Sequence, residues 1–85
     1  MPYRVTPVGD RELNDVSEFV GDRSFLVHQH NHPPVVVDGT GVLDAAGTGV
    51  RFYQKDDGHE GRDVRVWHIH ATADHQFSAQ HEAAI

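Results

Sequence analysis

Histidine is the residue type with the clearest chemical potential in this sequence. The 85-residue chain has eight histidines and no cysteine, and all eight histidines lie at or after residue 28. Two clusters have the spacing His-x-His: His28, His30 and His32 form the first, and His68 and His70 form the second. Because alternate residues of a strand face the same side of a sheet, each cluster can direct two imidazoles towards one ion. Zinc and non-haem iron sites on β-scaffolds are built in this way, so His68, His70, His28 and His30 are candidate ligands for zinc or iron.

A metal site needs at least one further ligand, and the order of the strands limits where that ligand comes from. His75 and Asp74 follow the second cluster, and each cluster could also complete the other. Both clusters lie at the C-terminal ends of predicted strands, so in an antiparallel meander they lie at opposite ends of the sheet. They share one ion only if the two strands run parallel, or if they meet across a subunit interface. We therefore prefer exposed or interfacial histidines, and keep a small His-ligated metalloprotein, an enzyme or a metal sensor, as the alternative hypothesis.

Other catalytic and ligand-binding motifs are incomplete. None of the three serines lies in a Gly-x-Ser-x-Gly elbow. The sequence Gly-Thr-Gly-Val occurs at 39–42 and again at 47–50, but no predicted helix follows either copy and neither has the lysine of a phosphate-binding loop. We interpret both copies as glycine-rich turns that flank a short bent strand. With no complete catalytic set, the sequence favours a protein that is not an enzyme.

The charge balance of the chain excludes some partners. Thirteen acidic residues against seven basic ones give a net charge of -6 with histidine neutral. Such a chain lacks the basic patch that binds a nucleic-acid backbone or an anionic membrane, so we expect neither partner at neutral pH. The first residues lack the apolar stretch of a signal peptide, and no window approaches the roughly 18 apolar residues of a membrane-spanning helix. We therefore expect a cytoplasmic or virion-associated protein that is not secreted.

Two segments have the pattern of helices. Asp10 is a suitable N-cap, the apolar residues that follow it fall on one stripe, and Gly21 can adopt the left-handed conformation that ends a helix. These features predict a helix over residues 11–20. A second, short C-terminal helix is expected after Asp74, where apolar residues again recur at helical spacing.

Alternating and β-branched residues predict the strands of the chain. They are expected over residues 3–8, 24–30, 35–37, 50–54 and 62–72. Together with the helices, these strands predict an α+β fold in a single domain over residues 1–85. In that fold the N-terminal strand and one helix pack on a mainly antiparallel, three- to five-stranded sheet.

The apolar content of these strands exceeds what one ten-residue helix can cover on one face of a sheet. We therefore expect the other face to meet a second subunit or a larger protein. The expected interface residues are Phe25, Val27, Trp67, Ile69 and Phe77. The preferred hypothesis is a small non-enzymatic binding or assembly module with a histidine-rich sheet surface. It would act as a homo-oligomer, as a subunit of a larger assembly such as a virion accessory protein, or as an inhibitor that docks on a larger partner.

Overall fold

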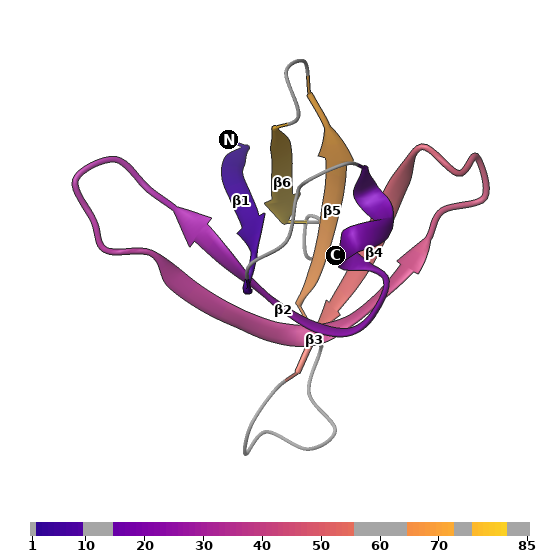
Figure 1. Ribbon diagram of the computed structural model, residues 1–85, viewed down its shortest axis with the longest axis horizontal. Helices are drawn as coiled ribbons and strands as arrows, with labels where there is room; N and C mark the ends of the chain where they lie inside the picture. Colours follow the sequence, from indigo (N-terminus) through magenta and orange to yellow (C-terminus); the bar gives the residue numbers. More distant parts are fainter. Residues whose placement is uncertain (1, 10–14, 56–64, 73–75, 82–85) are drawn as a thin grey trace.

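Six antiparallel strands, joined in chain order, close into a barrel (Figure 1). The computed structural model describes residues 2–9, 15–55, 65–72 and 76–81. The strands are β1 (Tyr3–Pro7), β2 (Gly21–His28), β3 (Val35–Leu43), β4 (Gly49–Gln54), β5 (Val66–Ala71) and β6 (Phe77–His81). A 3₁₀ helix, η1 (Val16–Phe19), lies between β1 and β2.

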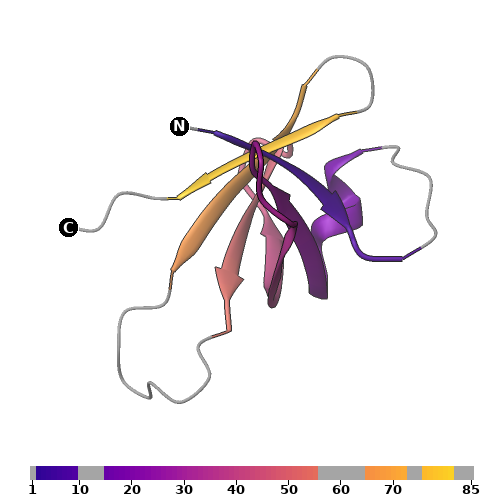
Figure 2. The same cartoon turned by 90° about the vertical axis from the view of Figure 1, so that its left-hand side faces the viewer.

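Pairing between the first and the last strand closes the barrel. Each strand pairs with its neighbour in the chain, and β1 also pairs antiparallel with β6, with Tyr3 opposite Ala79 and Val5 opposite Phe77. Figure 1 shows β1 beside β6, and the two strands cross in the turned view of Figure 2. Closure leaves neither of these two strands as a free edge, which removes the main site for unwanted strand addition.

The alternation of side chains along each strand divides the molecule into an apolar interior and a polar exterior. In β2, Phe25 and Val27 are buried, whereas Leu26 and His28 lie on the outer face and are only partly covered. The same alternation runs through the other strands. The buried core consists of Val5, Val16, Phe19, Phe25, Val27, Val37, Val50, Phe52, Trp67, Ile69, Phe77 and Ala79.

The 3₁₀ helix η1 covers one end of the barrel. It lies in the connection between the end of β1 and the start of β2 and contacts β2, β3, β4 and β5. Residues three apart lie on the same side of a 3₁₀ helix, so Val16 and Phe19 both enter the barrel end. The Phe19 ring meets Phe77 edge-on, with 5.0 Å between ring centroids. Asp15 caps η1 by accepting a hydrogen bond of 2.8 Å from the backbone N–H of Ser17.

Glycines in β3 allow η1 and β4 to approach the inside of the strand closely. A Cβ atom at Gly41 would lie 1.8 Å from the carbonyl oxygen of Phe19, and one at Gly39 would lie 2.1 Å from that of Tyr53. Real Cβ atoms do not approach backbone atoms this closely. The first Gly-Thr-Gly-Val copy is therefore part of a strand, and our interpretation of it as a turn is wrong.

The predicted α+β fold is wrong, because the described residues form a closed barrel of six strands with a four-residue 3₁₀ helix and no α-helix. Of the helix predicted over 11–20, residues 11–14 lie outside the described part of the chain, as does its predicted N-cap Asp10. The remainder forms the four-residue η1, after which Val20 is already extended and β2 begins at Gly21. The apolar stripe correctly indicated that Val16 and Phe19 are buried. A 3₁₀ turn suffices to bury both, since they cover one barrel end rather than the face of a sheet.

The expected C-terminal helix is also wrong. Its start at Asp74 lies outside the described residues, and the segment after it is strand β6. Phe77 and His81 are four residues apart, a spacing that a helix and a strand both place on one face. The intervening Ala79 distinguishes the two, because only a strand places it on the same face as Phe77 and His81. Ala79 is fully buried and pairs with Tyr3 of β1.

Candidate functional site

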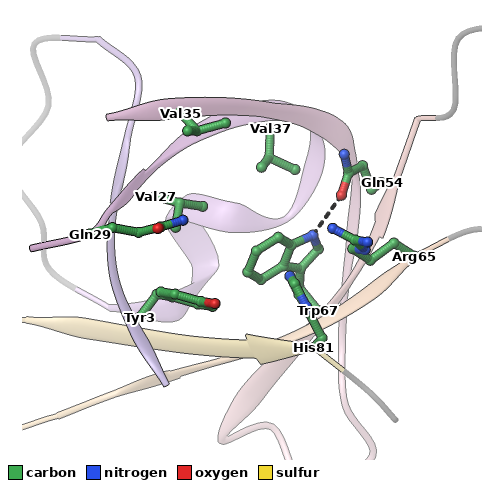
Figure 3. A pocket seen from close by; sticks show the side chains of 9 residues that line it. All are labelled: Tyr3, Val27, Gln29, Val35, Val37, Gln54, Arg65, Trp67 and His81. Carbon is green, nitrogen blue, oxygen red and sulfur yellow. Dashed lines mark hydrogen bonds between the residues drawn. The ribbon is translucent and has the colours of Figure 1, made fainter. Parts of the chain in front are cut away.

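A pocket of about 120 Å³ opens at the end of the barrel opposite η1 (Figure 3). Tyr3 is the first residue of β1, while Gln54 and His81 are the last residues of β4 and β6, so all three lie at this end of the antiparallel barrel. We call it the mouth pocket. Its described lining residues are Tyr3, Val27, Gln29, Val35, Val37, Gln54, Arg65, Trp67 and His81.

Trp67 forms a fixed wall of the mouth pocket. Its side chain is 4% exposed, and its indole Nε1–H donates a hydrogen bond of 2.9 Å to Oε1 of Gln54. The His81 ring meets the indole edge-on at 3.9 Å between centroids, and Phe25 supports it from the core at 5.5 Å. Hydrogen bonding and packing thus hold the indole in one orientation, with an apolar ring and an amide presented together.

The mouth pocket has an apolar side and a polar side. Val27 and Val37 are buried, while Val35 is 51% exposed and continues the apolar side out to the rim. Figure 3 shows Arg65 and Gln54 grouped near Trp67, and Gln29 beside Val27. A site of this kind can take a small apolar group that carries one polar end.

His81 lies at the rim, where its ring contacts two aromatic rings. Its centroid is 5.9 Å from that of Tyr3 and 3.9 Å from that of Trp67, and the Tyr3 and Trp67 centroids are 6.1 Å apart. Partial burial lowers the pKa of His81 below its ordinary value of 6.5, and the positive charges of Arg65 and of the amino terminus lower it further. The imidazole is therefore mainly neutral at pH 7 and can both donate and accept a hydrogen bond.

The residues expected at a protein interface lie inside the barrel instead. The exposed fraction is 4% or less for each of Phe25, Val27, Trp67, Ile69 and Phe77. Closure of the sheet covers these five side chains within one chain, whereas Val35 and Val36 on β3 remain 51% and 57% exposed. Val27 and Trp67 also line the mouth pocket, which is where these residues retain access to a ligand.

The structure does not bring the two histidine clusters together. β2 and β5 are three strands apart in either direction around the barrel, and His28, His68 and His70 are on its outer face. His30 lies in the exposed turn after β2. Among the residues that the structure describes, no three His, Cys, Asp or Glu side chains are grouped to hold a metal ion. His75 and Asp74, the further candidate ligands, lie outside those residues.

His28 has a local partner on the outside of the barrel. Its Nε2 lies 2.9 Å from the hydroxyl Oγ1 of Thr6 on β1. Partial burial, and then the nearby Arg4, lower the pKa of His28 below 6.5. His28 thus contributes to the β1–β2 pairing rather than to a cluster of imidazoles.

The sequence did not single out the polar residues of the mouth pocket. Tyr3, Gln54 and Arg65 occur alone in three separate segments, and His81 lies outside the two His-x-His clusters. Only β1–β6 pairing and barrel closure bring these positions together. The alternation of Phe77, Ala79 and His81 was the one available signal, because it places the histidine on the inward face of a strand.

The fold and the pocket define a small antiparallel β-barrel with one covered end and one open end. Comparison with protein-family models, with curated protein sequences and with solved structures found no match for this chain. No helix in the described residues is long and apolar enough to cross a membrane. These findings give no support to a viral, structural or metal-binding description. They also correct the expected histidine-rich sheet surface, since the described histidines are divided among β2, the turn after it, β5 and β6.

The pKa directions of His28 and His81 predict an acid-sensitive barrel. Because both folded-state pKa values lie below 6.5, the unfolded chain binds protons first as the pH falls. Their contribution to stability is complete above pH 6.5 and is lost as the pH decreases towards the folded-state pKa values. We expect urea unfolding at pH 7.5 and 5.5 to show lower stability at pH 5.5.

A double variant tests this assignment. His28→Asn/His81→Gln is expected to lose less stability over the same interval than the unsubstituted chain. The control is His30→Gln/His32→Gln in the exposed turn between β2 and β3, which should retain the pH dependence of the parent. Equal losses in the parent and in the His28/His81 variant would contradict the prediction.

Proposed function

We propose that this chain is a non-enzymatic binding module whose open barrel end receives one small apolar group of a protein partner. The observation that supports it is the mouth pocket itself, with Trp67 as a fixed wall and three valines on the apolar side. Deep barrel interiors are normally filled by side chains. In this barrel, side chains leave the mouth pocket unfilled at one end, while η1 covers the other end.

The size of the mouth pocket favours a single side chain or a compact fragment as the bound group. Its volume of about 120 Å³ is close to that of a cavity of roughly 150 Å³ that binds benzene in another protein. Full burial of one Val- to Phe-sized group contributes about 1.5–3 kcal/mol. Stable association therefore needs contacts beyond the pocket, and Val35, half exposed at the rim, is placed to provide one.

A binding role has better support than catalysis. The described neighbours of His81 are aromatic rings and the cation Arg65, so no described carboxylate orients the imidazole as a general base. The described pocket residues include no serine, threonine or cysteine that could act as a nucleophile. What the pocket does offer is shape, an apolar surface and a few directed polar groups, which suit recognition.

A pocket-filling variant tests the proposal. Trp67 is the only tryptophan of the chain, so its fluorescence, together with NMR chemical shifts, reports directly on the mouth pocket. We expect benzyl alcohol, benzamide and isovaleramide to shift the signals of Trp67 and Val37 at millimolar concentrations. Val37→Phe places a ring in the pocket and should weaken this binding about tenfold or more, the effect of about 1.4 kcal/mol lost.

The matched control places the same substitution one residue away. Val36 lies on the outer face of β3 and is 57% exposed, so Val36→Phe should leave probe binding unchanged. Thermal melting verifies that both variants are folded. The proposal fails if none of the probes shifts pocket signals, or if Val36→Phe and Val37→Phe weaken binding equally.

A further inference from the structure

The described lining of the mouth pocket carries a charge opposite to the net charge of the chain. The protein has a net charge of -6, yet the nine described pocket residues include Arg65 and no acidic residue. We infer that the mouth pocket selects an apolar group that carries a carboxylate, which Arg65 binds at the rim. This inference rests on the proposed binding function and specifies its ligand: either a free organic acid or the C-terminal residue of a polypeptide.

Arg65 is anchored at the rim by its own backbone. It directly precedes β5, and its carbonyl oxygen accepts a 2.9 Å hydrogen bond from the backbone N–H of Gln54. Figure 3 shows its guanidinium beside Gln54 and close to the indole of Trp67. The pKa of His81 is lowered in part by this positive charge, which agrees with that position. The backbone hydrogen bond places Arg65 at the rim, where its exposed guanidinium can offer a carboxylate the matching planar, bidentate geometry.

The described acidic residues all lie elsewhere on the barrel. Asp15 and Glu18 belong to the η1 segment at the covered end, and Asp44 is in the turn after β3, where it accepts from the backbone N–H of Thr48. Asp22 and Asp38 face outwards and accept hydrogen bonds from the hydroxyls of Thr40 and Ser24. None of these five carboxylates lines the pocket, so within the described residues none neutralises Arg65 there.

The uncharged polar groups of the pocket also suit an acceptor-rich ligand. Oε1 of Gln54 already accepts from Trp67, which leaves the Nε2 amide as the donor end of this side chain. The Tyr3 hydroxyl and the Gln29 amide supply further donors along the lining. A carboxylate has only acceptor atoms, whereas an ammonium group would bring further donors next to a cation.

The charge of the pocket favours a monoanion. Because the pKa of His81 is lowered, Arg65 is the principal positive charge of the described lining at neutral pH. One guanidinium balances one carboxylate, while a phosphate monoester carries about -1.5 to -2 at pH 7. The small volume of the pocket also favours a monoanion. An apolar group of the size of benzene or a leucine side chain nearly fills it and leaves little room for a larger, doubly charged group.

Pairs of acids and their amides test the inference with nearly equal shapes. Benzoate is compared with benzamide, isovalerate with isovaleramide, and acetyl-Gly-Gly-Leu with its C-terminal amide, by Trp67 fluorescence and NMR at pH 7.5. We expect each tested acid that enters the pocket to bind about tenfold more tightly than its amide, as charge-assisted hydrogen bonds require. Arg65→Gln should remove that preference and leave amide binding unchanged, and Arg65→Lys should retain part of it.

Arg51 provides the control for a general effect of charge. It is exposed on the outer face of β4, and Arg51→Gln makes the same change in net charge away from the pocket. This variant should keep the acid preference. Preference for the peptide acid identifies a protein C-terminus as the ligand and supports both the inference and the proposed protein partner. Preference for the small acids alone supports the inference but identifies a free organic acid and overturns the protein partner. Equal affinity for acids and amides overturns it while leaving the proposed function intact, whereas failure of every probe overturns both.

Discussion

Replacing Gly41 with alanine is expected to lower the free energy of unfolding by about 3 kcal/mol, at the upper end of typical overpacking costs. The added Cβ would lie 1.8 Å from the carbonyl oxygen of Phe19 and 2.9 Å from its carbonyl carbon. These are backbone atoms, so no change of side-chain rotamer relieves the clash. Either η1 must move out of the barrel end or β3 must bend. The loss is large against the roughly 4–13 kcal/mol expected for a domain of this length.

Urea unfolding of Gly41→Ala beside Val42→Ala measures this effect. Val42 is the next residue of β3, faces outwards and is 52% exposed, so its truncation should change stability by only about 0.5 kcal/mol. Gly39→Ala should be destabilising in the same way, because its Cβ would approach the carbonyl oxygen of Tyr53. A Gly41→Ala protein as stable as the parent would show that η1 does not lie against β3.

Which side chains of a strand are buried could be predicted from the sequence alone. Alternation placed Phe25 and Val27 on one face of the first histidine-bearing strand and His28 on the other, and the structure confirms it. The same holds for Trp67 and Ile69 against His68 in β5. This signal is local, because a strand exposes every second residue whatever its neighbours are.

Barrel closure could not be predicted in this way. It depends on the pairing of β1 with β6, which joins residues more than 70 positions apart, such as Val5 and Phe77. Without closure, the inward residues resemble an exposed apolar face that requires a partner. With closure, the same residues form the core. Short segments add a further ambiguity, since Val16 and Phe19, like Phe77 and His81, fit helical spacing without forming an α-helix.

The candidate site also depends on contacts between residues far apart in the sequence, which local patterns do not indicate. Paired histidines indicate that imidazoles share a face, yet their spacing does not indicate what lies opposite that face. In the structure β2 and β5 are on opposite sides of the barrel, and the pairs point away from each other. The mouth pocket shows the opposite case, a site that exists in the structure without any local pattern in the sequence. It is assembled from single residues such as Gln54 and Arg65, whose sequence neighbours do not indicate a shared site.

Phe25→Ala is expected to destabilise the barrel by about 3–5 kcal/mol and to weaken ligand binding as well. The Phe25 side chain is fully buried, and its ring meets Phe52 at 4.8 Å, Trp67 at 5.5 Å and Phe19 at 5.9 Å, each close to edge-to-face. Removing it leaves a cavity at the centre of an aromatic cluster that a small core cannot close. Trp67 then loses its support from the core, so the wall of the mouth pocket becomes less ordered.

The neighbouring substitution Leu26→Ala separates this effect from a general weakening of β2. Leu26 lies on the outer face opposite Val36, and its truncation should cost about 1 kcal/mol and leave probe binding unchanged. Urea unfolding and Trp67 fluorescence measure both effects on the same samples. If Leu26→Ala proved the more damaging of the two, β2 would have to be shifted by one residue. Such a shift would turn Phe25 and Val27 outwards and bring His28 into the interior, so this pair of variants tests the register on which the mouth pocket depends.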